Sequence, residues 1–272
     1  MRLNKFIAHH TKYSRRDADK LIFDGAVKVN GAICTNPATQ IEAGDKVSVK
    51  GNPVTQKKNY TFIVYNKPKG ELVTKKDDRG RKTIFHSLPT RLRGMRYVGR
   101  LDFASEGLLI LGDAVDIVDI LSNSDLPRVY KVKIKGDITP NIIDAMKRGV
   151  ELNNRKGAHE QNKINQLELQ PFINFEIIKN TPTYSTLKVA IAEGKNRELR
   201  RFFANFDREV VDLKRISYGW VSLNNLKPGK WRYFEPDEYN LLHDYLKMLK
   251  KEEKKKMYKE LDEKREEKEN RK

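Results

Sequence analysis

The 272-residue sequence has a single cysteine, Cys34, and no long apolar run. One thiol excludes an intrachain disulfide, which favours a reducing compartment. No stretch approaches the roughly 18 apolar residues of a membrane span, and the opening MRLNKFIAHH is too short and too polar for a secretory signal. These absences predict a cytoplasmic protein with no membrane partner.

The usual cofactor signatures are also missing. The sequence contains no GxGxxG, no P-loop and no glycine-rich strand-to-helix turn of the kind that binds S-adenosylmethionine. The one cysteine and the histidines show no metal-ligand spacing, and the histidines are scattered: His9, His10, His86, His159 and His243. We therefore expect no metal and no small-molecule cofactor.

Positive charge is abundant. The formal net charge is +18 and the sequence pI is about 9.7. Residues 250–272 hold 11 basic and 8 acidic side chains, a net of +3, so +15 belongs to the rest of the chain. Such an excess favours a polyanionic partner, nucleic acid above all, over charge that only keeps the protein in solution.

Residues 1–50 read as a small unit. Two short helices are predicted, the second with Ser14 as N-cap and Asp17 in capping-box spacing, followed by a strand that turns at Asn30-Gly31. Basic side chains on the helices include Arg15, Arg16 and Lys20, and together they could follow a phosphate backbone. Taken alone, they could equally form a solvated helix face.

Residues 51–59 are polar and contain Pro53, which favours a hinge over a regular element. From 60 to 240, strands outnumber helices and several pair as hairpins, which predicts an α+β domain with a mixed, mainly antiparallel sheet. The segment 60–68 alternates as a strand, whereas the LLIL run at 108–111 indicates a strand buried on both faces. Residues 241–272 are predicted to form a charged helical tail.

The first unit, RLNKFIAHHTKYSRRDADKLIFDGAVKVNGAICTNPATQIEAGDKVSV, resembles the S4 RNA-binding domain over its whole length. The resemblance rests on an SRR-A-LI--G-V-VNG skeleton and a late GD-V-V. It implies binding to structured RNA through Arg15, Arg16 and Lys20 among others.

Four later motifs carry a second resemblance: YNKPKGELVTKKDDRGRKTIF, YVGRLDFASEGLLIL, RVYKVKIKG and AEGKNRELRRFF. In this order, and with the closing LKRISYGWVSLNNLKPGKWRYF, they resemble the RNA pseudouridine synthases of the ribosomal RNA branch, which carry an N-terminal S4 domain. The resemblance spans about residues 1–240. It implies isomerisation of uridine to pseudouridine without cofactor or metal.

The resemblance assigns the catalytic roles. Asp102 matches the nucleophile, which could attack the sugar, attack uracil C6 or deprotonate C2′. Every route needs an ionised carboxylate, which burial disfavours and a nearby cation restores. The matching cation is Arg200, and only one of Arg200 and Arg201 can face Asp102. Tyr130 matches the tyrosine that stacks on the base.

The same resemblance implies that further residues bind the substrate. Leu199 matches a residue of the uracil pocket, and Arg100 matches one that fills the place of the extruded nucleotide or contacts its phosphate. Side chains of the first motif are predicted to contact RNA: Asn66, Lys67, Lys69, Arg79 and Arg81.

Three positions depart from the family pattern: Arg128-Val129, where lysine-glutamate is usual, LGDAVD after the apolar strand, and Glu198, where glutamine is common. A silent RNA-binding or ribosome-assembly protein remains an alternative, as does an S4-bearing methyltransferase, although the latter needs the missing glycine-rich turn. The sequence thus predicts a monomeric enzyme acting on ribosomal RNA, with the large subunit favoured.

Overall fold

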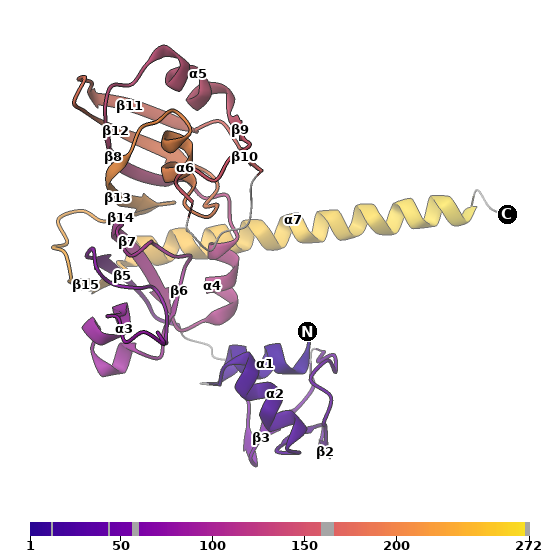
Figure 1. Cartoon of the computed structure of the whole chain (residues 1–272). Helices are drawn as coiled ribbons and strands as arrows, with labels where there is room; N and C mark the ends of the chain where they lie inside the picture. The colour runs from indigo at the N-terminus through magenta and orange to yellow at the C-terminus, as the bar shows by residue number, and fades with distance from the viewer. Residues whose placement is uncertain (12, 43, 56–59, 159–165, 270–272) are drawn as a thin grey trace. The chain divides into compact units, whose positions relative to one another are not determined.

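The computed structural model describes residues 1–11, 13–42, 44–55, 60–158 and 166–269, with side chains described as far as Lys255. The chain forms two compact units, Met1–Tyr233 and Phe234–Lys272. Figure 1 shows the course of the chain. In the described residues, no helix is long and apolar enough to cross a membrane. One of the five histidines, His159, lies outside the described residues.

The first 53 residues form two helices and a small antiparallel sheet. The helices are α1 (Leu3–His10) and α2 (Arg15–Phe23), and the sheet has the order β2-β1-β3-β4, made of β1 (Val27–Val29), β2 (Ala32–Ile33), β3 (Val47–Val49) and β4 (Asn52–Pro53). Their core is apolar and includes Leu3, Ile7, Ala18, Ile22 and Val27.

The predicted capping box and the predicted tight turn both form in this part of the chain. Ser14 Oγ accepts the N–H of Asp17 at 3.1 Å, while the Asp17 carboxylate accepts the N–H of Ser14 at 2.9 Å, which completes the capping box. Asn30 and Gly31 both adopt positive φ, as the tight turn between β1 and β2 requires. One expectation is wrong: Asn52–Pro53 pair with β3, so the small sheet extends into the predicted hinge. Positions 56–59 lie outside the described residues.

A nine-stranded sheet forms the centre of the second part of this unit. Its main path is β11-β12-β8-β13-β7-β5-β15, and β14 and β6 pair with β13 and β7. The strands are β5 (Phe62–Lys67), β6 (Arg96–Tyr97), β7 (Glu106–Gly112), β8 (Arg128–Lys135), β11 (Asn174–Lys179), β12 (Tyr184–Ile191), β13 (Val210–Tyr218), β14 (Val221–Ser222) and β15 (Trp231–Tyr233). Only β13 and β7 pair in parallel among these described strands. The predicted mixed, mainly antiparallel sheet is confirmed.

The strands differ in how they are buried. β7 is buried from Gly107 onwards, as the LLIL run predicts, and β8 alternates between buried and exposed residues. For β5 the predicted alternation is wrong, because all six residues are buried. Ile63 and Tyr65 on one face of β5 pack in the main core with Ile84 and Phe85, and Val64 and Asn66 on its other face are buried as well.

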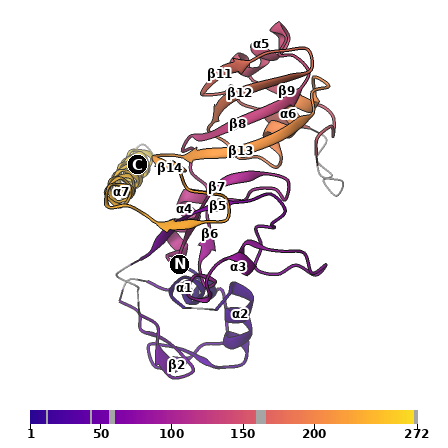
Figure 2. The same cartoon turned by 90° about the vertical axis from the view of Figure 1, so that its left-hand side faces the viewer.

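Helices and a small hairpin surround the sheet: α3 (Ile84–Ser87), the 3₁₀ turn η1 (Thr90–Leu92), α4 (Val115–Ser122), α5 (Pro140–Arg148), α6 (Glu198–Ala204), β9 (Val150–Leu152) and β10 (Leu167–Leu169). Phe202 of α6 and Met146 of α5 pack with Val132 and Leu187 of the sheet in one core. Figure 2 shows α6 on one side of β8, β12 and β13. The second unit is the helix α7 (Pro236–Glu269), which begins before the predicted tail.

Candidate active site

The turn from Asp102 to Ser105 immediately precedes β7. The N–H of Ser105 donates to the carbonyl oxygen of Asp102 at 3.1 Å, which closes the turn. From β5, the Lys67 ammonium donates to the carbonyl oxygens of Pro68, Asp102 and Ser105 at 2.9, 3.2 and 2.8 Å. Three carbonyl acceptors match the three hydrogens of one ammonium group. Lys67 therefore fixes the backbone that carries Asp102.

This position corrects two expectations. Lys67 is 0% exposed and Asn66 is 1% exposed, so neither can contact RNA as predicted. Asn66 instead donates to the carbonyl oxygen of Leu226 at 2.6 Å. Burial lowers the pKa of Lys67 to about 8, with nearby carboxylates acting in the opposite direction, so the group still carries its charge at neutral pH.

Two guanidinium groups face the Asp102 carboxylate. Arg197 Nη1 lies 3.3 Å from Asp102 Oδ2, and Arg200 Nε lies 3.6 Å from the same oxygen. The second distance is longer than a hydrogen bond. Both arginines place positive charge beside the carboxylate. The structure thus brings together Asp102 and Arg200, which are 98 positions apart in the sequence.

Arg200 is fixed by its remaining nitrogens. Nη1 donates to the Val210 carbonyl at 2.9 Å, and Nη2 lies within hydrogen-bond distance of the Ala104 carbonyl and Ser105 Oγ, at 3.4 and 3.3 Å. Burial lowers the pKa of Arg200, the adjacent Arg197 charge adds to this, and Asp102 counteracts both. Arg201 is buried and donates instead to the Asn154 carbonyl at 3.0 Å, which agrees with the expectation that only one of the pair faces Asp102.

Sequence reasoning missed Arg197. It is the N-cap of α6 in the left-handed conformation, with φ of 51°, and its Nε donates to the Gly157 carbonyl at 2.7 Å. One signal could have indicated it: Arg197 belongs to the same basic motif as Arg200, NRELRRF, three positions before it.

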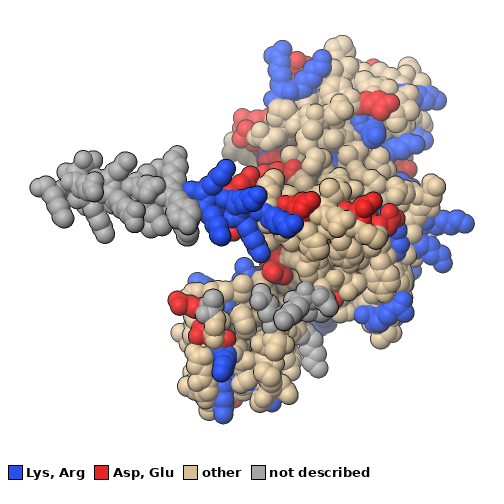
Figure 3. Space-filling model, turned by 180° about the vertical axis from the view of Figure 1, so that it is seen from behind, with Lys and Arg blue, Asp and Glu red and all other residues tan. Residues whose placement is uncertain are grey.

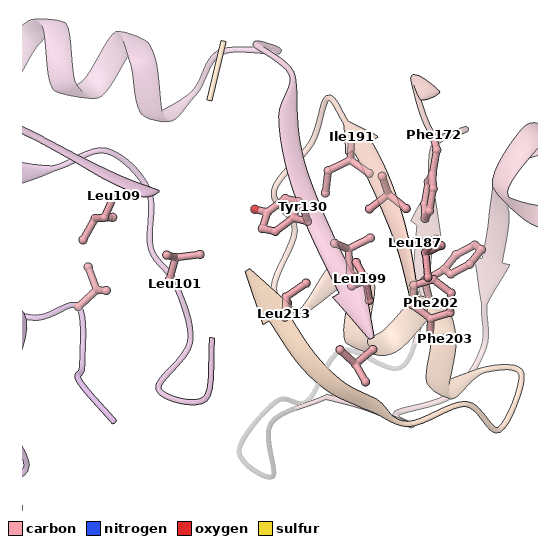
Figure 4. Close-up of a cluster of buried hydrophobic side chains, with 14 of the residues drawn as sticks. Leu101, Leu109, Tyr130, Phe172, Leu187, Ile191, Leu199, Phe202, Phe203 and Leu213 are labelled. Carbon is pink, nitrogen blue, oxygen red and sulfur yellow. The ribbon is translucent and has the colours of Figure 1, made fainter. Parts of the chain in front are cut away.

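A cavity of about 120 Å³ lies beside Asp102. Tyr130 from β8 and Leu199 from α6, which are 8% and 3% exposed, lie in its wall. Figure 4 shows the hydroxyl of Tyr130 directed toward the segment of Leu101, with Leu199 and Leu213 near its ring. Asp102, Tyr130 and Leu199 therefore meet at one small, partly apolar cavity, while Arg200 lies outside its wall and faces it only through Asp102.

Arg215 is a second residue that the sequence prediction missed. It lies on β13 in the cavity wall, is 2% exposed, and donates from Nε to the Leu108 carbonyl at 2.7 Å. Its Nη2 is buried and has no hydrogen-bond partner in the described part of the chain. Arg215 thus lies in the cavity wall with one donor unused, which the pattern of β13 alone did not indicate.

Two departures from the family pattern also lie in the cavity wall. Arg128 is buried and donates to the carbonyls of Ala192 and Ser124 and to the Tyr218 hydroxyl. Glu198 is 5% exposed and accepts the N–H of Lys195 at 2.9 Å. Burial raises the pKa of Glu198 to about 7. Arg128 therefore has a structural role in this chain.

The cavity adjoins a hollow of about 700 Å³ that also contains Asp102 and Arg197 in its wall. Arg100 is exposed and lies in the walls of both. Arg81 borders the hollow and is bound to Asp77 at 2.7 Å. Arg79 is exposed, and Lys69 pairs with Asp212 at 2.7 Å. The predicted RNA contacts other than Asn66 and Lys67 are thus accessible.

The predicted contacts of the first domain are accessible as well. Arg15, Arg16 and Lys20 are all exposed on α2, whereas Ala18 and Ile22 face the core. Among the residues that the structure describes, no cluster of three or more His, Cys, Asp or Glu side chains could hold a metal ion.

Comparison with known proteins agrees with this arrangement. The sequence profile of the family described as RNA pseudouridylate synthase matches residues 61–205, and that of the S4 domain matches residues 1–47. A Helicobacter pylori protein named as an uncharacterized RNA pseudouridine synthase is 46% identical over 90% of this chain and 95% of its own length. Ribosomal large subunit pseudouridine synthase B of Bacillus subtilis is 32% identical over 89% and 95%.

A solved structure shows the same similarity to pseudouridine synthases. A crystal structure of a pseudouridylate synthase superimposes with a TM-score of 0.61 at 26% identity, covering 89% of this chain and 99% of that one. The chain belongs to the RNA pseudouridylate synthase family, with an S4 domain at its N-terminus. It is therefore an RNA-directed isomerase, which decides against both alternatives, the silent RNA-binding protein and the methyltransferase.

Proposed function

We propose that this enzyme converts a uridine of ribosomal RNA, in the large subunit, to pseudouridine in the cytoplasm, as a monomer. An S4 domain joined to the catalytic domain favours a structured RNA, and one relative is named for the large ribosomal subunit. The observation that carries the proposal is the Asp102 carboxylate between Arg197 and Arg200 at the edge of the 120 Å³ cavity.

In this proposal the target nucleotide leaves its stack, at a cost of a few kcal/mol, and its base enters the cavity. Tyr130 and Leu199 pack against the uracil ring. Arg215 Nη2, the unused donor, binds a uracil carbonyl oxygen, which accepts the hydrogen bond that the free protein leaves unmade. Arg100, at the wider hollow, contacts the phosphate of the extruded nucleotide or fills its vacated place.

Asp102 is the nucleophile in this scheme. The positive charges of Arg197 and Arg200 face its carboxylate, while Lys67 and the Ser105 turn hold its backbone in position. Attack on the sugar carbon would give a covalent intermediate of the glycosidase type. Attack on uracil C6 and deprotonation at C2′ remain the alternatives, and each uses the same ionised carboxylate.

Asp102→Asn tests the assignment. It removes the carboxylate but keeps the size of the side chain, so pseudouridine formation in ribosomal RNA should be abolished while RNA affinity changes little. Mass spectrometry of rRNA from cells with and without the gene identifies the modified site. Asp116→Asn, on the exposed surface of α4, is the matched control. Modification by Asp102→Asn at the parent rate would refute the assignment.

A further inference from the structure

One face of the sheet carries a group of lysines away from the cavity. This lysine face consists of Lys131 and Lys133 on β8, Lys188 on β12, Lys214 on β13 and Lys179 on β11. All are exposed except the half-buried Lys214. All but Lys188 border a hollow of about 640 Å³.

The strand register places like charges directly opposite one another. Lys131 is opposite Lys188 across one strand boundary and opposite Lys214 across the other. Opposed residues have their Cβ atoms about 5 Å apart, and like charges in such positions destabilise a sheet. In the described part of the chain, neither Lys131 nor Lys188 has an ion pair or a hydrogen bond. The free protein therefore holds unneutralised positive charge here.

Acidic residues neutralise this charge only in part. Glu106 lies 4.0 Å from Lys214, Asp212 pairs with the adjacent Lys69, and Glu176 is opposite Lys188 in the register. With Lys69 included, six lysines face three carboxylates, which leaves +3. The view from behind shows basic side chains interspersed with acidic ones over the upper part of the molecule (Figure 3).

The lysine face is separate from the catalytic cavity. Because side chains alternate along a strand, Tyr130 and Val132 point to one face of β8, and Lys131 and Lys133 point to the other. The first face is covered by α5 and α6, which share its core. A ligand of the lysine face cannot be the nucleotide that reacts at Asp102.

We propose that the lysine face binds the phosphate backbone of the substrate RNA at a segment distant from the target uridine. This inference rests on the proposed function, since it requires a large structured RNA. Protein interfaces are depleted in lysine, whereas phosphate binding that is independent of sequence depends on lysine and arginine. RNA phosphates also relieve the repulsion between Lys131 and its two neighbours.

The test is the triple variant Lys131→Gln, Lys133→Gln, Lys188→Gln. Its affinity for a large-subunit rRNA domain should fall, and its plot of log affinity against log salt should be shallower by about 2 to 3. Affinity for a short oligonucleotide that contains only the target stem-loop should match the parent. Lys131→Gln alone should raise the thermal unfolding midpoint of the free protein.

The control variant removes the same charge from scattered exposed positions: Lys147→Gln, Lys227→Gln and Lys251→Gln. Equal losses for both triple variants would mean that only net charge acts, which overturns the proposal. Parent-like binding of the rRNA domain by the first triple variant overturns it too, even if that variant loses affinity for an acidic protein. Failure of the unmodified enzyme to modify rRNA would instead refute the proposed function.

Discussion

The buried carboxyl group of Glu198 predicts a pH-dependent stability that one substitution should remove. Burial is the largest influence on its pKa, which lies at about 7, and the Glu193 charge acts in the same direction. The N–H of Lys195 and the charges of Lys195 and Arg128 act in the opposite direction. Glu198 is thus far harder to ionise in the folded chain than in the unfolded one.

The sign and size of the effect follow from the two pKa values. Below pH 4.5, the ordinary value for this group, the carboxyl is protonated in both states and costs nothing. As the pH rises toward 7, the unfolded chain releases the proton and the folded chain keeps it, so the free energy of unfolding falls. The values lie about 2.5 apart at about 1.36 kcal/mol for each pH unit, a loss of about 3 kcal/mol.

Glu198→Gln should abolish this loss, because the amide cannot ionise and its oxygen can still accept the N–H of Lys195. Urea denaturation between pH 4 and 8, followed by the fluorescence of Trp220 and Trp231, measures the unfolding of the catalytic domain. The variant should gain up to about 3 kcal/mol over the parent as the pH rises through this window. Glu151→Gln, at an exposed position of β9, reports the same change outside the cavity. A difference between Glu198→Gln and the parent that is constant with pH would refute the reasoning.

Three further substitutions have definite expected outcomes. Lys67→Met leaves three carbonyl oxygens without their donor, so urea denaturation should show a loss of about 3 kcal/mol or more, and kcat should fall as the turn at Asp102 loosens. Gly107→Ala would place a Cβ 2.2 Å from the Arg215 carbonyl oxygen, at a positive φ that alanine rarely adopts, so the free energy of unfolding should fall by about 3 kcal/mol or more. The control Gly94→Ala, whose Cβ would lie in open space, should lower it by less than about 1 kcal/mol. Arg200→Lys keeps a charge but loses the fixed guanidinium geometry, so kcat should fall about tenfold or more in single-turnover assays, and an unchanged kcat would contradict the role of Arg200.

Elements with a strong local signal were predictable from the sequence. The capping box at Ser14, the turn at Asn30-Gly31 and the LLIL strand each depend on neighbouring residues, and each forms as predicted. β5 was misjudged because its alternating letters describe a half-buried strand, whereas residues distant in the sequence, such as Ile84 and Phe85, also pack against it and no face is left in water. The burial of Lys67 follows from that same position.

In the candidate site, too, residues within recognisable motifs were predictable, and residues whose roles depend on distant segments were not. Asp102, Tyr130, Leu199 and Arg200 were found because motifs identify them; the structure places the first three in the wall of one cavity and Arg200 beside Asp102. Arg197 and Arg215 escaped because their roles arise from contacts with distant segments. A pattern of residue types cannot show that the Arg215 guanidinium reaches the Leu108 carbonyl across the junction of two parallel strands.

These distant contacts explain how a short turn can hold the proposed nucleophile, Asp102, in position. The segment from Asp102 to Ser105 has one backbone hydrogen bond of its own, between those two residues. Lys67 holds its backbone from β5, and Arg200 binds Ser105 and faces Asp102 from α6. Both side chains are charged and almost fully removed from water, so each needs the turn as a partner as much as the turn needs them. The geometry at Asp102 is consequently formed only when β5, β7 and α6 are all in place, which couples catalytic competence to completion of the sheet.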